Sequence, residues 1–251
     1  YMINCTIVNG VFVINVSYDT KVYTEEQAHA IADGFCTQLE AIVAHPLSVT
    51  ATEPTASDLG ASGWTDSQFE VIKAEYAERG EDIQRVYPLT PMQEGILLEY
   101  MNDPKTSAYV LINRYEMGFV PTEQQVRYAL DVLAAKHEVF RTSVIYRGVD
   151  TPCQAIVNRQ LGLRFVDISD ETDIYAASER VHKEELAATF DLQSSPLYRV
   201  VVLKTSENSC HILLVTHHII IDGWCQPIYF QDFLVYSIDS FFNLAVAAGS
   251  E

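Results

Sequence analysis

The stretch VTHHIIIDGW, residues 215–224, places two histidines side by side at the end of an apolar run. Asp222, Gly223 and Trp224 follow four to six residues after His218. Histidine titrates near neutral pH, so such a ring can act as a general base or as the hydrogen-bond partner of an attacking group. Three interpretations are open at this point: a metal site, a catalytic base with its supports, or two polar residues that end a strand.

Strand geometry separates the two histidines. Neighbouring residues on a strand face opposite ways, so His217 and His218 cannot both point at one site if the strand continues through them. A metal site needs more ligands than the one histidine and one aspartate that H-H-x-x-x-D can offer. We therefore predict that one ring is turned into the core and fixes the backbone, while the other faces a cleft. Two satisfied polar residues at a strand end remain the alternative.

Asp222 and Gly223 fit a supporting role better than a catalytic one. A carboxylate followed by glycine at a strand-to-helix turn is expected to be an anchor, buried against a cation, with the glycine permitting tight backbone geometry. Arg141, in KHEVFRTSV (136–144), lies at a helix-to-strand transition. Its forked guanidinium could reach Asp222 with two hydrogen bonds, so we predict an ion pair between them.

The elements that must position these residues alternate along the chain. Apolar periodicity and turn residues predict strands at 108–117, 142–147, 153–157, 163–168, 197–204 and 210–216. Helices are expected at 65–79, from Pro91, from Thr122 to His137, at 173–188 and at 226–237. Thr90 is a plausible N-cap, and Gln93 is expected to cap that helix rather than to react. This mixture predicts an α/β or α+β fold.

The first 63 residues form a separate pattern. Alternation around Asn9-Gly10 predicts a hairpin over 5–19, and a Thr24–Gln27 capping box begins a helix that should end at His45-Pro46. Residues 46–63 are rich in Pro, Ser, Thr, Ala and Gly and have no periodicity, which predicts a linker.

Composition excludes several classes of protein. The formal charge of −18 argues against nucleic acid and anionic membrane surfaces as partners. Five scattered cysteines without a C-x-x-C pair indicate free thiols in a reducing compartment, so we expect a cytoplasmic location. A nucleophilic role for Cys225 lacks a second supporting residue. The chain opens without Met and without a signal peptide, which suggests a piece of a longer protein.

Four motifs together resemble the condensation-domain superfamily of nonribosomal peptide synthetases. HHIIIDGW is similar to its H-H-x-x-x-D-G motif, and KHEVFRT to R-H-E-x-L-R-T, with Lys136 and Phe140 as departures. YPLTPMQEGILLEY resembles the opening motif of condensation domains that follow an epimerisation domain. FDLQSSPLYRVVVL (190–203) also fits the family, and the four motifs occur in the expected order over residues 82–237.

The resemblance implies a fold like that of chloramphenicol acetyltransferase, an α+β sandwich in two lobes with the active site between them. Residues 64–251 would be the N-terminal lobe, truncated before the second one. Residues 1–45 look like the C-terminal tail of an upstream epimerisation or condensation domain, with 46–63 as the linker. This piece alone is therefore expected to be inactive.

The resemblance also implies a function. The amine of an acceptor aminoacyl group would attack the thioester of a donor peptidyl group, D-configured at its end. Both substrates would ride on 4′-phosphopantetheine arms of peptidyl carrier domains, with epimerisation and adenylation domains as neighbours and no metal or directly bound cofactor. His218 would lie beside the attacking amine, as base or positioning group, and the backbone at Gly223 would help to hold the oxyanion. His217, Asp222 and Arg141 would support the site.

Three rivals remain at this point. An epimerisation, cyclisation or terminal fungal condensing domain belongs to the same superfamily, although cyclisation domains replace the histidines with aspartates. A stand-alone CoA-dependent acyltransferase shares the histidine motif. A non-catalytic fragment that docks a carrier belongs to a different class, and binding without turnover would identify it.

Overall fold

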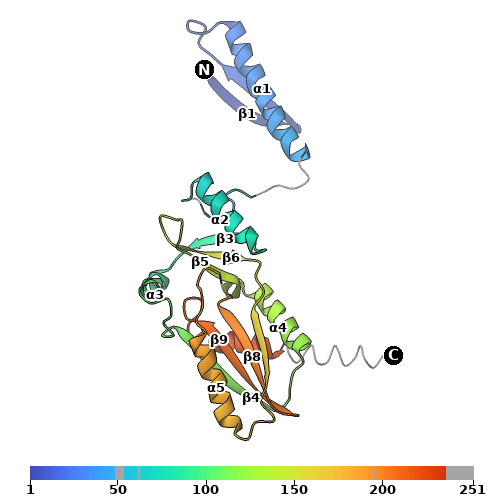
Figure 1. Cartoon of the computed structure of the whole chain (residues 1–251). Helices are drawn as coiled ribbons and strands as arrows, with labels where there is room; N and C mark the ends of the chain where they lie inside the picture. The colour runs from blue at the N-terminus through green and yellow to red at the C-terminus, as the bar shows by residue number, and fades with distance from the viewer. Residues whose placement is uncertain (49–53, 62, 195, 236–251) are drawn as a thin grey trace, which may run out of the picture. The chain divides into compact units, whose positions relative to one another are not determined.

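The computed structural model describes residues 1–48, 54–61, 63–194 and 196–235 (Figure 1). The chain separates into two compact units, Tyr1–Pro54 and Thr55–Glu251. The division falls inside the segment 46–63 that the sequence predicts as a linker. Each unit has strands and helical segments of its own.

The first unit is a hairpin followed by one helix. Strands β1 (Met2–Val8) and β2 (Val11–Ser17) pair antiparallel across Asn9 and Gly10, whose φ angles are +50° and +80°. Two consecutive left-handed residues are what the tightest hairpin turn requires, so the Asn-Gly prediction is confirmed. Helix α1 (Glu25–Ser48) is capped as predicted, with the Thr24 N–H donating to Gln27 Oε1 at 2.9 Å.

The predicted end of α1 at His45-Pro46 was wrong, because the helix continues to Ser48. A proline removes one backbone hydrogen bond, and a helix of 24 residues tolerates that loss close to its end. Among the described residues of this unit only Ala28 is buried. Several large apolar side chains of the hairpin and of α1 are instead exposed, including Ile7, Val11, Phe12 and Ile42.

The second unit contains two sheets. The smaller sheet has the antiparallel order β3 (Ile83–Pro88), β6 (Cys153–Val157), β5 (Thr142–Ile145). The larger sheet has the order β4 (Val110–Met117), β9 (Ser209–His217), β8 (Tyr198–Ser206), β7 (Gly162–Asp167), in which only β7 and β8 are parallel among the described strands. The histidine strand β9 therefore has a neighbour on each side, and its central residues Leu213, Leu214 and Val215 have no exposed surface.

The helices follow the predicted positions closely. They are α2 (Asp66–Glu78), α3 (Pro91–Asn102), α4 (Glu123–Lys136) and α5 (Ile174–Ala187), with a 3₁₀ turn η1 (Glu138–Arg141) after α4. The last helix covers residues 226–235, and positions 236 and 237 of its predicted span lie outside the described residues. Thr65, Thr90 and Thr122 each begin a helix in a capping box with a glutamine, which confirms the expected starts.

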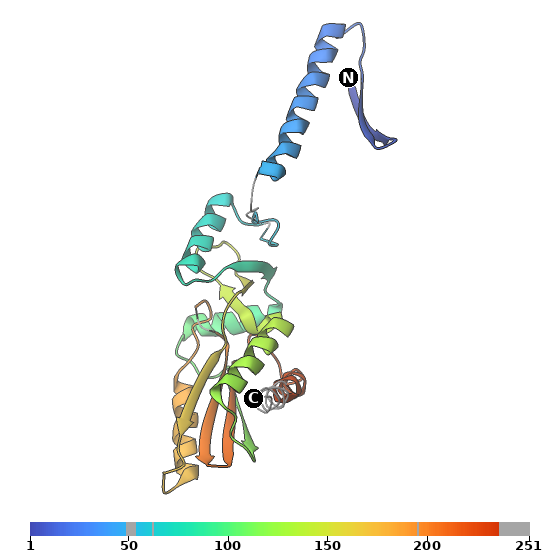
Figure 2. The ribbon, with the colours of Figure 1, turned by 90° about the vertical axis from the view of Figure 1, so that its right-hand side faces the viewer.

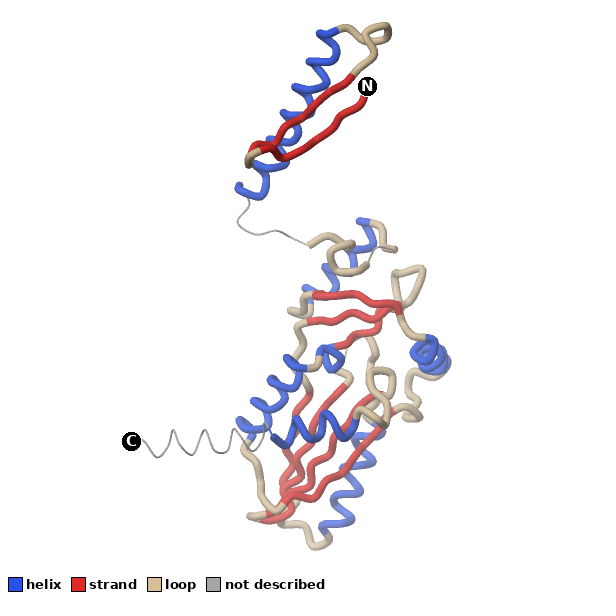
Figure 3. The backbone as a smooth tube through the Cα atoms, turned by 180° about the vertical axis from the view of Figure 1, so that it is seen from behind, coloured by secondary structure: helices blue, strands red, loops and turns tan. Residues whose placement is uncertain are grey.

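Helices cover both faces of the larger sheet. Arg114 and Tyr115 are neighbours on β4 and so point to opposite faces. Arg114 pairs with Glu179 of α5 at 3.0 Å, whereas Tyr115 stacks on Phe230 of the 226–235 helix with ring centroids 3.6 Å apart. Figures 2 and 3 show α5 on one side of this sheet and the 226–235 helix on the other.

The part of the predicted linker that precedes α2 is folded onto the second unit. Ala56 and Ala61 are buried in a small core beneath α2 and β3. Gly60 has a φ of +86°, and a Cβ there would come 2.6 Å from the carbonyl oxygen of Val86. The close approach of two backbones therefore requires glycine at this position.

Candidate functional site

The histidine pair lies where β9 ends and a turn over residues 218–220 begins. The backbone N–H of His217 donates to the carbonyl of Leu197, just before β8, at 3.0 Å. The N–H of His218 donates in the other direction, to Tyr109 just before β4, at 2.8 Å. The backbone of the pair is thus fixed from both neighbouring strands, which separates the two rings as strand geometry predicts.

The His217 ring is turned into the core. His217 is 2% exposed. Its ring packs near Tyr109 and edge-on to Phe190, and the distances between ring centroids are 6.3 and 6.0 Å. Its Nδ1 accepts a hydrogen bond from the Ile219 N–H at 3.2 Å. Burial, with a smaller contribution from neighbouring His218, lowers the pKa of His217 to about 4. This ring is therefore neutral at neutral pH and holds the following turn.

His218 has the opposite surroundings. The residue is half-buried, and neither ring nitrogen makes a hydrogen bond within the described part of the chain. The next three residues, Ile219, Ile220 and Ile221, are all buried again. The ring of His218 is consequently less enclosed than that of His217 and is not held by a hydrogen bond to any described residue.

The predicted ion pair between Arg141 and Asp222 is not formed in this structure. The Arg141 guanidinium donates to the carbonyls of Ala134 and Val157, at 3.0 and 3.1 Å, and to the side chain of Gln84. It thereby joins the end of α4 to the edge strand β3 and the central strand β6 of the smaller sheet. With these acceptors in place, Arg141 stabilises the scaffold without Asp222.

Asp222 itself is exposed rather than buried. The three buried isoleucines end just before it, and its carboxylate accepts from the N–H groups of Trp224 and Cys225 at 3.0 and 3.2 Å. Hydrogen bonds from the Cys225 side chain and from these backbone groups lower the pKa of Asp222. Its role here is to cap the turn that leads into the 226–235 helix.

Gly223 does not need the conformational freedom that the sequence suggested. Its φ lies outside the left-handed region, and no atom lies within 4 Å of the position a Cβ would take. What the glycine leaves is open space beside the backbone. Trp224, which follows it, is 88% exposed.

Cys225 is an unsuitable nucleophile. Burial raises the pKa of its thiol, and Asp222 adds to the rise by accepting a hydrogen bond from it and by its negative charge. All five cysteines are free thiols in this structure. His137 has a structural place too, since its Nε2 lies 2.6 Å from the Asp232 carboxylate of the 226–235 helix.

Two glutamines near the histidine turn were missed as site residues. Gln93 caps α3 as predicted, but its Nε2 also donates to the carbonyl of Ile219 at 3.0 Å and to Gln154 Oε1 at 3.1 Å. Gln154 of β6 in turn donates to Gln93 Oε1 and to the Pro88 carbonyl, both at 3.1 Å. No local sequence pattern marks the hydrogen bonds from Gln93 to Gln154 and to Ile219, because each joins residues more than 60 positions apart in the sequence.

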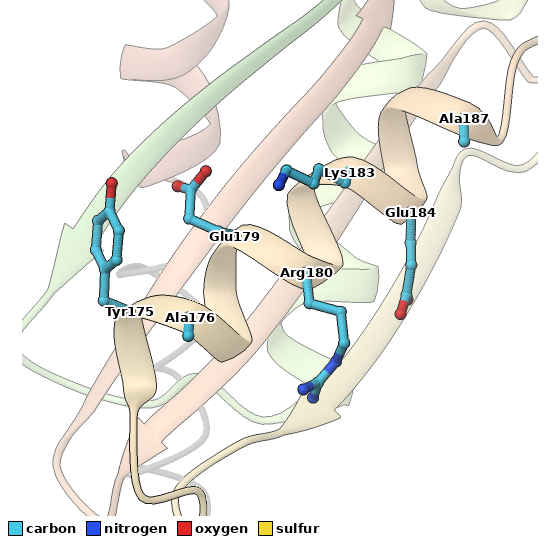
Figure 4. Close-up of a pocket in the computed structure, with 7 residues that line it drawn as sticks. All are labelled: Tyr175, Ala176, Glu179, Arg180, Lys183, Glu184 and Ala187. Atoms are coloured by element: carbon cyan, nitrogen blue, oxygen red, sulfur yellow. The ribbon is translucent and has the colours of Figure 1, made fainter.

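One hollow on the surface is a poor candidate for a rival site. A shallow hollow runs along α5, and Figure 4 shows the side chains that line it, among them Glu179, Arg180 and Glu184. These three charges are already paired, with Arg114, Glu171 and Arg164 respectively. Within the residues that the structure describes, no group of three or more potential ligands could hold a metal ion. Nor does any described helix have the length and apolar character needed to cross a membrane.

Comparison with known proteins assigns the chain to a family. The family model for the condensation domain matches residues 83–237. The chain is 30% identical to bacitracin synthase 3 of Bacillus licheniformis over 231 residues, and 31% identical to gramicidin S synthase 2 of Brevibacillus brevis over 155 residues. These matches cover 90% and 61% of this chain but only 4% of each relative.

Solved structures show the same fold. The starter condensation domain of rhizomide synthetase matches with a TM-score of 0.56 and 20% identity, covering 59% of this chain and 37% of that one. The first condensation domain of the calcium-dependent antibiotic synthetase matches with a TM-score of 0.53 and 19% identity, over 59% and 36%. The predicted mixed α/β, acetyltransferase-like fold is therefore confirmed. The chain belongs to the condensation-domain superfamily of nonribosomal peptide synthetases.

Proposed function

We propose that the complete domain forms a peptide bond between two substrates held on carrier domains. The amine of the acceptor aminoacyl group attacks the thioester carbonyl of the donor peptidyl group. A C–N bond forms, the C–S bond breaks, and the proton lost by the amine ends on the departing thiolate as a free thiol. Both substrates ride on 4′-phosphopantetheine arms, so the domain itself needs no bound cofactor.

The setting of His218 carries this proposal. Its backbone is fixed by Tyr109 while its half-buried ring has no hydrogen-bond partner among the described residues, and its neighbour His217 is fully engaged in the core. Such a ring can receive or orient the proton of an attacking amine. Because thioester aminolysis is downhill, holding both arms together supplies much of the acceleration.

The turn after the pair would stabilise the reacting carbonyl. Asp222 fixes the backbone at Trp224 and Cys225, and the space around Gly223 is open. The backbone N–H of Gly223 is suited to donate a hydrogen bond to the oxyanion that develops on the thioester carbonyl. In this proposal Asp222 acts by capping the turn, and Arg141 acts only on the scaffold.

The partners follow from the flanking sequence. The exposed apolar face of the first unit supports its assignment as the tail of an upstream epimerisation or condensation domain, whose remainder would cover that face. Together with the opening motif of α3, this supports a donor with a D-configured end. Peptidyl carrier and adenylation domains would be the other neighbours, and the five free thiols support a cytoplasmic location.

Replacement of His218 tests the function directly. In the complete domain within its synthetase, with the synthetase's own carriers loaded by its own adenylation domains, His218→Ala should lower single-turnover peptide formation by roughly 100-fold or more. His182→Ala, which alters another half-buried histidine on α5, is the matched control and should keep the wild-type rate. Wild-type turnover by His218→Ala would refute the assignment.

Two further arms address the rivals. Transfer from octanoyl-CoA in place of the donor carrier would favour a CoA-dependent acyltransferase. Carrier binding without turnover by the complete domain would favour a docking role. The 251-residue piece alone should give no product, since the structural matches span little more than a third of the solved domains.

A further inference from the structure

Four helices in the described part of the chain begin with the same capping box. In each case a threonine N-cap accepts from the N–H of a glutamine three residues later, and the glutamine Oε1 accepts from the threonine N–H. The four pairs are Thr24–Gln27, Thr65–Gln68, Thr90–Gln93 and Thr122–Gln125. The four boxes are so alike that capping alone gives no reason to single out one of them.

One of the four glutamines does more than cap. Gln93 also uses its Nε2, which donates to the Ile219 carbonyl at 3.0 Å and to Gln154 Oε1 at 3.1 Å. In the described part of the chain, the Nε2 groups of the other three capping glutamines donate to no residue. The additional hydrogen bonds of Gln93 therefore arise because α3 begins next to Ile219 and Gln154, since a capping box does not require them.

The acceptor of this bond belongs to the turn that carries His218. The Ile219 N–H donates to His217 Nδ1, and the Ile219 carbonyl accepts from Gln93 Nε2. The His218 N–H donates to the Tyr109 carbonyl. These three bonds fix the peptide groups on both sides of the His218 side chain. The direction of the His218 ring depends on that backbone. Loss of the hydrogen bond from Gln93 to the Ile219 carbonyl would therefore change the orientation of the ring.

We infer that Gln93 is a positioning residue for His218, which it holds in place through the Ile219 carbonyl. The inference rests on the proposed function of His218. Gln154 acts as a second brace, because its amide pairs with that of Gln93 and also donates to the Pro88 carbonyl. Gln93 thereby links the opening motif to the histidine motif, which lies 126 residues further along the chain.

Gln93→Glu separates positioning from capping. A glutamate at this position keeps the oxygen that caps Thr90 and places negative charge at a helix N-terminus, where it is favourable. It cannot donate to Ile219 when ionised, and its charge faces that carbonyl. The Gln154 amide, which already donates to Gln93 Oε1, can keep donating to the new carboxylate, but the Ile219 carbonyl loses its donor.

The matched control is Gln68→Glu, the same change in the same capping box of α2, where the amide makes no further contact among the described residues. Both variants and His218→Ala are assayed in the complete domain within its synthetase, with the synthetase's own loaded carriers. We expect Gln93→Glu to lower kcat by roughly 10- to 100-fold, because a small misplacement of a reacting group has effects of that size. The KM for the acceptor carrier and the melting temperature should change little, and Gln68→Glu should match the wild type.

Each outcome has a distinct meaning. Wild-type kcat in Gln93→Glu, or an equal loss in Gln68→Glu, overturns the positioning role. Wild-type turnover in His218→Ala instead overturns the proposed function. The NMR signals of the His218 ring, in protein with labelled histidine, should move in Gln93→Glu and stay in place in Gln68→Glu. If Gln93→Glu does not fold, Gln93→Met, which removes the donor without adding charge, provides the same kcat and KM comparison.

Discussion

The two units of this chain use the same local devices and differ in what they bury. Each has antiparallel strands with alternating side chains and a helix begun by a threonine–glutamine box. Yet the first unit buries only Ala28 among its described residues, whereas β8 alone buries Val200, Val201, Val202 and Leu203 completely. Local pattern specifies an element, but burial against a neighbouring element supplies most of its stability.

A truncation in the core of the second unit should show the largest contrast. Leu214, at the centre of β9, has no exposed surface, so Leu214→Ala should lower the free energy of unfolding by about 3–5 kcal/mol. Ile7 in the first unit is 72% exposed, and Ile7→Ala should change that energy by less than about 0.5 kcal/mol. Urea unfolding of the 251-residue chain by itself, followed by far-UV circular dichroism, measures both. Equal losses would show that Ile7 is covered in solution.

Removing one partner of an ion pair should also cost more free energy of unfolding in the second unit than in the first, with a smaller difference than for the apolar substitutions. The Arg159 side chain is 3% exposed and holds Glu81 by two hydrogen bonds, at 2.6 and 2.8 Å. Glu81→Ala leaves a buried guanidinium without this carboxylate and should cost about 3 kcal/mol. The exposed pair His29–Glu25 in the first unit, 3.9 Å apart, offers the control, and Glu25→Ala should have no measurable effect on unfolding in urea. A tolerant Glu81→Ala would mean that Arg159 finds another acceptor or reaches water.

The parts of the fold that sequence predicted are those whose causes are local. Asn9-Gly10 needs no distant partner to turn, and Thr122 caps α4 through a residue three positions away. Chemically specific spacing also located the histidine pair, because alternation along a strand separates adjacent side chains whatever the rest of the chain does.

The parts that sequence did not predict depend on distant partners. Arg141 could be matched with Asp222 on charge alone, but the carbonyls of Ala134 and Val157 already accept its hydrogen bonds. Segment 55–61 reads as a linker because its composition lacks periodicity, although two small alanines there fill a gap beneath α2. The contact of Gln93 with Ile219 spans 126 residues, and only the assembled fold brings them together.

The contrast in burial also predicts a pH dependence that resides in the second unit. Burial lowers the pKa of His217 to about 4, against about 6.5 for an unfolded histidine. Between these values the unfolded chain binds a proton that the folded chain does not, so stability falls as the pH is lowered from about 6.5 to about 4. The loss from this residue should reach no more than about 3 kcal/mol, and it should not grow further below pH 4.

His217→Gln isolates this contribution, because glutamine does not titrate. The variant should be less stable at pH 7, since it disturbs a packed ring and its bond to Ile219, but its stability should fall less steeply between pH 6.5 and 4 than that of the wild type. Urea unfolding at half-unit pH steps gives both slopes. Equal pH dependence of stability in the wild type and the variant would mean that the His217 ring is hydrated in solution. The two histidines would then not differ in burial as the structure has them. A flattened slope would instead show that the core at the end of β9 keeps one ring neutral, so that His218 is the ring of the pair left to take part in chemistry.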